Sequence, residues 1–179
     1  NFVNKRKDQS MNLILSDKAM DLSFNNQSIE FIDLSKLKIS NCLGCFSCWT
    51  KTPGKCIIRD DAIKIYPKIA TSENVLYISK IKYGSYDTIM KTMLERALPI
   101  QQAFIQLIDK ETHHIQRNVI QKKAIIIGYG DLSNEEKEIF IQLIQRNAKN
   151  MCFKDFRVVF SKEEQLEQIV NNEVQLWVK

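Results

Sequence analysis

Short apolar runs alternate along this chain with segments whose apolar residues recur at helical spacing. The clearest run lies at 122–128, and a helix is predicted behind it, because Ser133 and Glu136 have the spacing of a capping box. Further strands are predicted at 28–34, 74–79 and 156–160, and further helices at 10–23, 60–69, 86–97 and 161–171. The stretch 99–118 is mixed and partly helical in pattern. Such alternation is typical of an α/β domain with a parallel sheet.

The predicted order of elements begins with a helix at 10–23, where Met11, Ile14 and Leu15 recur at helical spacing. Only four strands are then predicted, whereas a doubly wound sheet of this size normally has five, with the first strand near its centre. We therefore expect an apolar first strand upstream of Asn1, missing from the chain shown. The length of 179 residues suits one domain, so we expect a single domain over 1–179 with a cysteine-rich loop at 41–57.

Composition and charge exclude several classes of protein. Hydrophobic residues make up 44% of the chain, which is too many for a disordered protein. The net charge of +5 arises from 26 basic and 21 acidic residues mixed along the sequence, so no nucleic-acid partner is expected. The sequence shows neither an apolar run long enough to span a membrane nor a signal-peptide pattern, so we expect a cytoplasmic protein with no membrane partner.

Four of the five cysteines fall in one short segment, in the pattern C-x2-C-x2-C-x7-C formed by Cys42, Cys45, Cys48 and Cys56. Two-residue spacers let successive thiolates turn toward one point, as in the compact half of a ferredoxin cluster motif. A turn predicted at 52–55 returns Cys56 as a candidate fourth ligand. A [4Fe–4S] cluster and free, redox-active thiols both fit this pattern. Zinc fits it less well, because zinc sites more often use two separated C-x2-C pairs.

The cysteine segment also carries a family resemblance. It reads Asn41-Cys42-Leu43-Gly44-Cys45-Phe46-Ser47-Cys48-Trp49, then Lys51-Thr52-Pro53-Gly54-Lys55-Cys56 and the pair Asp60-Asp61. These residues resemble the flavodoxin-like NADPH-dependent FMN reductase family, and most closely its iron–sulfur flavoprotein-like branch. The resemblance extends over nearly the whole chain. It implies a flavodoxin-like, three-layer, doubly wound parallel sheet that binds FMN at the carboxyl ends of its strands, in a homo-oligomer that is a dimer or a tetramer.

Three loops hold FMN in this family, and the resemblance assigns the first loop, which follows the first strand, to residues 1–10. The cofactor-binding residues that it implies there are Lys5, Gln9 and Ser10. Phe2 and Val3 stand where the family has Gly and Ser. Bulky side chains at those two positions depart from the pattern, because a phosphate needs close backbone approach and hydroxyl donors.

The second loop lies along the flavin ring in the family, and the third offers backbone to the ring. The cofactor-binding residues implied for the second loop are Ser79, Lys80, Ile81, Lys82, Tyr83, Gly84 and Ser85. Those implied for the third loop are Gly128, Tyr129 and Gly130. Lys80 and Lys82 replace a proline and a tyrosine of the family pattern, whereas the glycines of the third loop permit close backbone approach.

We therefore expect an FMN-binding oxidoreductase or electron-transfer flavoprotein that uses NAD(P)H or an iron–sulfur cluster as its redox partner. A small molecule or a redox protein would complete the electron transfer. No catalytic side chain is predicted, because the flavin itself supplies the chemistry. The predicted ligands of a [4Fe–4S] cluster are Cys42, Cys45, Cys48 and Cys56. The alternative, which the altered first loop favours, is a degenerate flavodoxin-like module without FMN that acts as a partner or structural subunit.

Two further pairs of charged residues adjoin these motifs. Asp60 and Asp61 are expected to cap the helix that follows them, because carboxylates complement the positive end of a helix dipole. Glu95 and Arg96, at the end of the helix after the second loop, are expected to make surface or subunit contacts.

Overall fold

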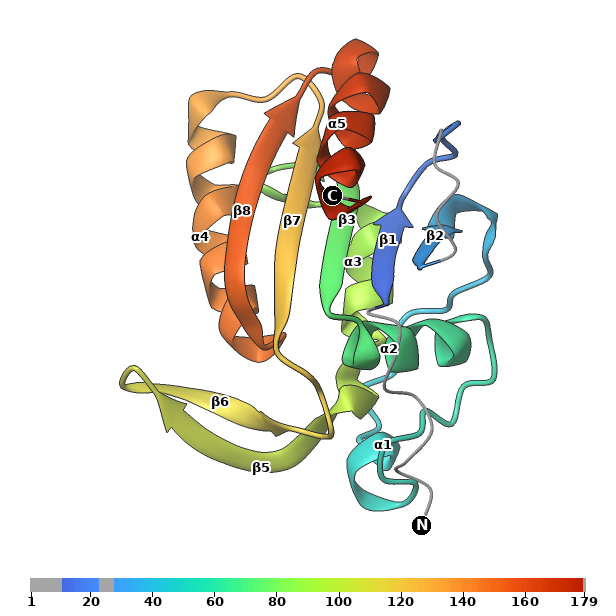
Figure 1. Cartoon of the computed structure of the whole chain (residues 1–179). Helices are drawn as coiled ribbons and strands as arrows, with labels where there is room; N and C mark the ends of the chain where they lie inside the picture. Colours follow the sequence, from blue (N-terminus) through green and yellow to red (C-terminus); the bar gives the residue numbers. More distant parts are fainter. Residues whose placement is uncertain (1–10, 23–27, 179) are drawn as a thin grey trace.

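A parallel sheet forms the centre of the structure, a computed structural model that describes residues 11–22 and 28–178 (Figure 1). Its strands lie in the order β2 (Ile29–Asp33), β1 (Asn12–Ser16), β3 (Asn74–Lys82), β7 (Lys122–Tyr129) and β8 (Phe153–Ser161), and each neighbouring pair is parallel. The short strand β4 (Ser85–Tyr86) pairs antiparallel with the end of β3. This order is doubly wound and has its switch point between β1 and β3.

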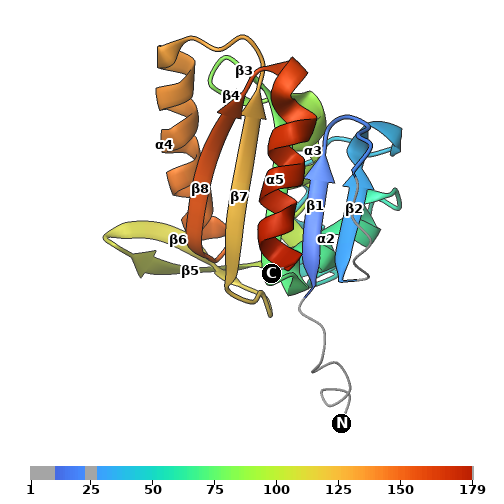
Figure 2. The same ribbon diagram turned by 45° about the horizontal axis from the view of Figure 1, so that its top comes forward.

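Helices cover both faces of the sheet. One face is covered by α2 (Ala62–Thr71), α3 (Thr88–Glu95) and α4 (Asn134–Asn150), and the other by α5 (Leu166–Val178) (Figure 2). Successive residues of β3 serve the two faces in turn: Val75 and Tyr77 pack toward α2–α4, and Leu76 and Ile78 toward α5. The predicted fold class, a flavodoxin-like three-layer sheet, is confirmed.

The helix predicted behind β7 is confirmed as α4, and its start is fixed by the predicted capping box. The Ser133 hydroxyl accepts a hydrogen bond from the Glu136 N–H at 3.1 Å, and the Glu136 carboxylate accepts one from the Ser133 N–H at 3.1 Å. Phe140 and Ile144, on the inward face of α4, are fully buried. Short 3-10 turns complete the regular structure at Leu34–Lys36, Leu98–Ile100 and Glu163–Gln165.

The helix predicted at 10–23 is wrong, and so is the prediction that the first strand is missing. Residues 12–16 form β1, which lies between β2 and β3 and is buried at every position. Leu13 and Leu15 face one side of the sheet and Ile14 the other, so the three central residues are all apolar instead of alternating with polar ones. Polar residues, Asn12 and Ser16, bound this short apolar run on both sides. The spacing of the apolar residues in this region was therefore also compatible with a helix.

The chain after β1 also differs from the prediction. Residues 17–22 form no helix, and Met20 and Leu22 pack on the sheet face that α5 covers. Within the described residues, α5 is the only helix on this face. None of the helices in the described part of the chain is long and apolar enough to cross a membrane.

The mixed segment 99–118 is a β-hairpin and not a partly helical stretch. Its strands β5 (Gln101–Ile108) and β6 (Glu111–Gln116) extend away from the central sheet (Figure 1). Phe104, Ile105 and Leu107 are 61–76% exposed. Because both faces of β5 reach solvent, apolar and polar residues do not alternate along it as they do in a half-buried strand.

Candidate functional site

Three strands of the sheet end side by side at one edge, and this edge forms the candidate site. The register pairs Ser16 of β1 with Ile78 of β3, and Lys80 of β3 with Tyr129 of β7. Asp17 therefore follows β1 next to the end of β3, while the predicted second and third loops lie next to each other. Doubly wound sheets bind ligands in the crevice outside these strand ends, at the switch point.

The predicted second loop is a tight hairpin between β3 and β4. Its two central residues, Tyr83 and Gly84, both have left-handed backbone angles, with φ of 54° and 69°. A Cβ at Gly84 would lie 2.6 Å from the Ile139 side chain of α4, so no larger residue fits there. The backbone N–H of Tyr83 donates a hydrogen bond to the Glu136 carboxylate at 3.1 Å. The hairpin is thereby fixed to the start of α4.

Gly128, at the end of β7, lies against the hairpin and not at an open binding surface. A Cβ at Gly128 would lie 2.8 Å from the Ile81 side chain, so the absent side chain makes room for Ile81. Gly130 has a φ of 136°, and its N–H donates a hydrogen bond to the Ser161 carbonyl at 3.2 Å. Tyr129 is 5% exposed and points into the strand ends. The third loop is therefore packed against the second.

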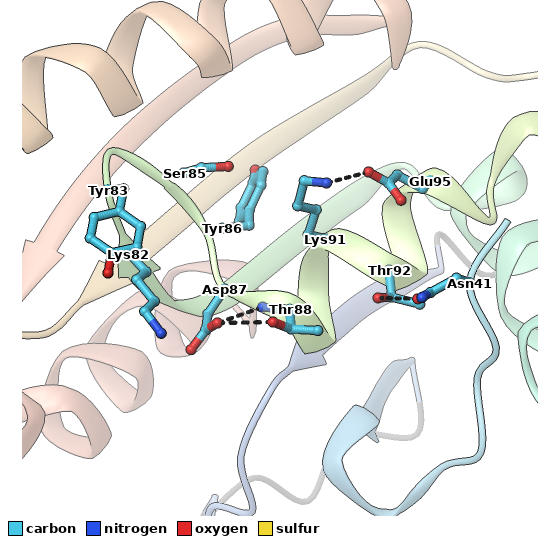
Figure 3. Close-up of a pocket in the computed structure, with 10 residues that line it drawn as sticks. All are labelled: Asn41, Lys82, Tyr83, Ser85, Tyr86, Asp87, Thr88, Lys91, Thr92 and Glu95. Carbon is cyan, nitrogen blue, oxygen red and sulfur yellow. Dashed lines mark hydrogen bonds and ion pairs between the residues drawn. The ribbon is translucent and has the colours of Figure 1, made fainter.

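A cavity of about 580 Å³ opens beside the hairpin and runs along α3 (Figure 3). Its lining residues are Asn41, Lys82, Tyr83, Ser85, Tyr86, Asp87, Thr88, Lys91, Thr92 and Glu95. Lys82 contributes a cation whose Nζ lies 5.7 Å from the centroid of the Tyr83 ring. The Asp87 carboxylate accepts a hydrogen bond from the Thr88 N–H at 2.7 Å and caps α3. The volume lies within the about 300–1,000 Å³ of small-molecule sites.

The end of β1 carries a buried carboxylate that the sequence analysis missed. Asp17 is 8% exposed. Its Oδ2 accepts hydrogen bonds from the Lys80 N–H at 2.7 Å and the Ser79 hydroxyl at 3.0 Å. Its Oδ1 accepts one from the Tyr129 hydroxyl at 2.8 Å. Burial raises the pKa of Asp17, and these three hydrogen bonds partly offset that effect.

The first predicted cofactor loop, with Lys5, Gln9 and Ser10, lies outside the described residues and precedes β1 in the chain. The loop that follows β1 begins instead at Asp17. Its described residues include no glycine, and the Ser16 hydroxyl before it donates to the Lys18 carbonyl at 2.8 Å. Lys18 pairs with Glu163 at 2.7 Å.

The four predicted metal ligands lie together. Cys42, Cys45, Cys48 and Cys56 all line one small enclosed cavity of about 30 Å³, which Trp49 and Ile58 help to close. The predicted turn at 52–55 is confirmed, since the Lys55 N–H donates to the Thr52 carbonyl at 2.8 Å and the chain then returns Cys56 to the other three cysteines.

The backbone of the cysteine loop winds tightly to achieve this. Gly44 and Phe46 have positive φ angles of 62° and 54°, and the short helix α1 (Ser47–Thr50) follows. The N–H of Gly54 donates to the Cys48 carbonyl at 2.9 Å. The loop places Cys45 in solvent and leaves Cys42, Cys48 and Cys56 half-buried.

The surroundings of the cysteines shift two of their pKa values, in opposite directions. Hydrogen bonds from the side chain and backbone of Ser47 lower the pKa of Cys45. Burial raises the pKa of Cys48, and negative charge on the neighbouring Cys56 and Cys42 raises it further by like-charge repulsion. Within the described residues, no three Cys, His, Asp or Glu side chains converge as ligands of a single metal ion.

Arg96 is buried against the cysteine loop, which contradicts the surface position expected for it. Its side chain is 1% exposed and pairs with Asp60 at 2.6 Å. It also donates to the Ser40 carbonyl at 2.7 Å and contacts the Cys56 Sγ at 3.5 Å. Asp60 accepts the Ala62 N–H at 3.2 Å at the start of α2, which bears out half of the predicted cap. Asp61, at the N-cap position, makes no side-chain capping bond and instead accepts the Lys38 N–H at 3.0 Å. No local pattern signalled this contact, because Arg96 and Asp60 lie 36 positions apart in the chain.

FMN, which the family resemblance implies, meets two different environments in this chain. The cavity beside the hairpin fits a flavin ring, because it has the size of a small-molecule site and combines Tyr83 and Tyr86 with hydrogen-bonding groups and Lys82. The end of β1 does not fit a phosphate, because the carboxylate of Asp17 already takes the hydrogen bonds there and repels an anion.

Two curated proteins with similar sequences carry the same kind of name. An iron–sulfur flavoprotein of Methanocaldococcus jannaschii is 25% identical over 99 residues, which cover 55% of this chain and 50% of that protein. An iron–sulfur flavoprotein of Archaeoglobus fulgidus is 30% identical over 94 residues, which cover 52% of this chain and 42% of that protein. The matched stretch thus spans half or less of each relative. No family model matches the chain.

Solved structures extend the likeness over nearly the whole fold. An FMN-dependent NADH-azoreductase from Bacillus anthracis, in complex with FMN, has a TM-score of 0.56 at 12% identity and covers 93% of this chain and 96% of its own. An NAD(P)H:quinone oxidoreductase from Methanothermobacter marburgensis has a TM-score of 0.56 at 10% identity, over 90% and 93% of the two chains. At these identities the likeness establishes the fold. The resemblance predicted from the cysteine segment is confirmed by the sequence relatives.

Proposed function

We propose that this relative of the iron–sulfur flavoproteins binds a flavin, with FMN as the family cofactor, and acts as an NAD(P)H-dependent oxidoreductase. A small molecule or a redox protein would exchange electrons with it. The relatives and the fold neighbours support this redox function, and they do not favour the degenerate module without FMN.

The observation that carries the proposal is the adjacency of the hairpin cavity and the cysteine loop. Asn41 lines the cavity and lies 3.4 Å from the Thr92 hydroxyl of α3, and the next residue, Cys42, is the first of the four clustered cysteines. Figure 3 shows Asn41 at one end of the cavity and the hairpin at the other. One cavity of small-molecule size thus adjoins a compact set of four thiols, which is an arrangement suited to passing electrons between two redox centres.

The chain's own residues would bind and orient the flavin. A bound flavin supplies hydride and single-electron chemistry at its ring. Lys82 places a positive charge at the cavity wall, Ser85 and Thr88 offer hydroxyls, and the buried Tyr86 closes the wall against the core. Since none of these groups needs to take up or release a proton, no catalytic base is assigned.

The four cysteines would hold a [4Fe–4S] cluster. Burial raises the pKa of Cys48, and negative charge on the neighbouring Cys56 and Cys42 raises it further, because thiolates that face one another repel. Binding of iron would remove that repulsion, and the enclosing Trp49 and Ile58 would limit access of water. The thiols would stay reduced, and the cluster intact, in the cytoplasm.

We also propose that the chain forms a homo-oligomer. The hairpin of β5 and β6 exposes Phe104, Ile105 and Leu107, and the cysteine loop exposes Leu43 and Phe46. Apolar groups concentrated on a projecting element favour association. Sedimentation velocity would show a dimer or tetramer for the wild type and a smaller species for the double variant Phe104→Ser, Leu107→Ser.

The function is tested by anaerobic reconstitution of the full chain with iron, sulfide and FMN. We expect the protein to retain flavin, iron and sulfide after desalting, and its flavin to be reduced by NADPH or NADH. Cys48→Ser should lose the iron and sulfide and keep the flavin. Cys152→Ser, which alters the one cysteine outside the cluster, should keep all three.

Two results would count against the proposal. A protein that remains colourless after reconstitution would point to the degenerate module. A protein that binds flavin with no iron would leave the four cysteines as thiols and remove the cluster from the proposal.

A further inference from the structure

We propose that Asp17 takes the place of a flavin phosphate, so that this site selects its ligand by the flavin ring and accepts riboflavin as well as FMN. This inference rests on the proposed function, because it names which flavins the same site takes.

Asp17 lies where a phosphate would be expected. It follows β1 at the switch point of the sheet, next to the ends of β3 and β7. The loop after the first strand is where the family resemblance places a phosphate, and the described part of that loop here begins with an acidic residue. Asp17 is held by its own N–H, which donates to the Ile78 carbonyl at 3.1 Å.

The hydrogen-bond partners of Asp17 are donors of the kind that bind a phosphate. A backbone N–H from Lys80, a hydroxyl from Ser79 and a phenol from Tyr129 all donate to the Asp17 carboxylate. Backbone N–H groups and hydroxyls are the donors that bind phosphate oxygens in proteins. In this chain, an internal carboxylate already satisfies them.

The charges around Asp17 also disfavour a phosphate. Lys18 is paired with Glu163 at 2.7 Å and lies over the Tyr129 ring at 5.6 Å, and the charge of the exposed Lys80 also acts on Glu163. Asp87, at the start of α3, adds a second negative charge that acts on Asp17. An incoming phosphate would therefore meet two carboxylates and two lysines that both act on Glu163. The cavity beside the hairpin, by contrast, balances Lys82 and Lys91 against Asp87 and Glu95, so an uncharged ring system fits it without a net charge.

The test compares FMN with riboflavin, which differ by the phosphate alone. Apoprotein of the full chain is titrated into each flavin, and binding is followed by quenching of flavin fluorescence. We expect the wild type to bind the two flavins with dissociation constants within about threefold of each other. Asp17→Ser should bind FMN about tenfold more tightly and leave riboflavin binding unchanged, because the three donors become free for a phosphate.

Two further variants keep the test decisive. Asp17→Asn preserves the shape of the network and removes its charge, so it reports the charge effect even if Asp17→Ser folds poorly. Asp21→Ser removes an exposed carboxylate from the same loop and should leave both affinities unchanged.

Each outcome separates the inference from the function on which it rests. A wild type that prefers FMN over riboflavin by more than about tenfold would overturn the inference and leave the proposed function standing. A wild type that binds neither flavin would overturn both the proposed function and the inference, even if Asp17→Ser binds FMN. Absence of flavin binding in all variants would overturn both.

Discussion

The end of β1 and the cysteine loop each bury an ionic group, and the two regions satisfy it in different ways. Asp17 is surrounded by neutral donors, from Lys80 N–H, Ser79 and Tyr129. Arg96 instead faces an opposite charge, Asp60, and contacts a sulfur atom of the candidate cluster site. The first arrangement is complete without a ligand. The second leaves the Nε of Arg96 buried with no hydrogen-bond partner among the described residues, beside the Cys56 thiol.

This contrast indicates where a bound group would stabilise the fold. A network whose donors are all used gains little from a ligand, whereas a buried cation next to a set of thiols gains from anything that gathers negative charge on those sulfurs. We therefore expect a bound cluster to stabilise the cysteine loop strongly, and a ligand at the end of β1 to stabilise that region only weakly.

The largest effect is expected at Arg96. Arg96→Leu leaves Asp60 as a half-satisfied carboxylate in a largely buried position, and it should lower the free energy of unfolding by about 3–5 kcal/mol. Arg146→Leu is the matched control, because Arg146 is 69% exposed and pairs with Glu111 on the surface. It should cost no more than about 1 kcal/mol. Urea denaturation of both variants checks the difference, and equal losses would show that the Arg96 pair contributes no more than a surface pair.

A smaller effect is expected from the Asp17 network. Tyr129→Phe removes one of the donors to Asp17 and should lower the free energy of unfolding by about 1–3 kcal/mol. Tyr77→Phe provides the control, since the Tyr77 hydroxyl is buried without a hydrogen-bond partner in the described part of the chain. Its removal should be neutral or slightly stabilising. Thermal unfolding of the two variants measures both effects, and a loss of equal size in each would contradict the role of the Tyr129 hydroxyl.

The same two regions show how far sequence reasoning reaches. The cysteine turn and the α4 capping box depend on residues within about ten positions of one another, so their spacing predicted them. The Asp17 network joins residues 62 and 112 positions apart, and Arg96 lies 36 positions from Asp60. Such contacts exist only after the sheet has assembled, and no local pattern of residues in the sequence predicts them.

Two elements were misread for local reasons. β1 lies between the two layers of helices, so it lacks the alternation of a half-buried strand. Its polar ends, Asn12 and Ser16, shortened the apolar run by which a buried strand is predicted. The hairpin of β5 and β6 turns through Asp109 and Lys110, both at positive φ and neither of them glycine. The usual turn signal of a two-residue hairpin was therefore absent.

The smallest expected effect, the dependence of stability on pH, distinguishes the two regions by its sign. Burial raises the pKa of Asp17 above its usual value of 3.8. The native state therefore holds the Asp17 proton more tightly than the unfolded chain does, and the contribution of Asp17 to stability is lost as pH rises from 3.8 through the native pKa. At Asp60, burial opposes ionisation, but hydrogen bonds from Arg96 and the Ser40 N–H outweigh it and lower the pKa.

Asp60 therefore contributes stability above pH 3.8 that is lost as pH falls from there through its native pKa. Urea unfolding of wild type, Asp17→Asn and Asp60→Asn across the acid range measures both contributions. The wild-type free energy of unfolding minus that of Asp17→Asn should fall as pH rises, and the same difference for Asp60→Asn should rise. If both differences had the same sign of slope, the two buried ionic groups would be satisfied in the same way, and the contrast between these regions would not hold.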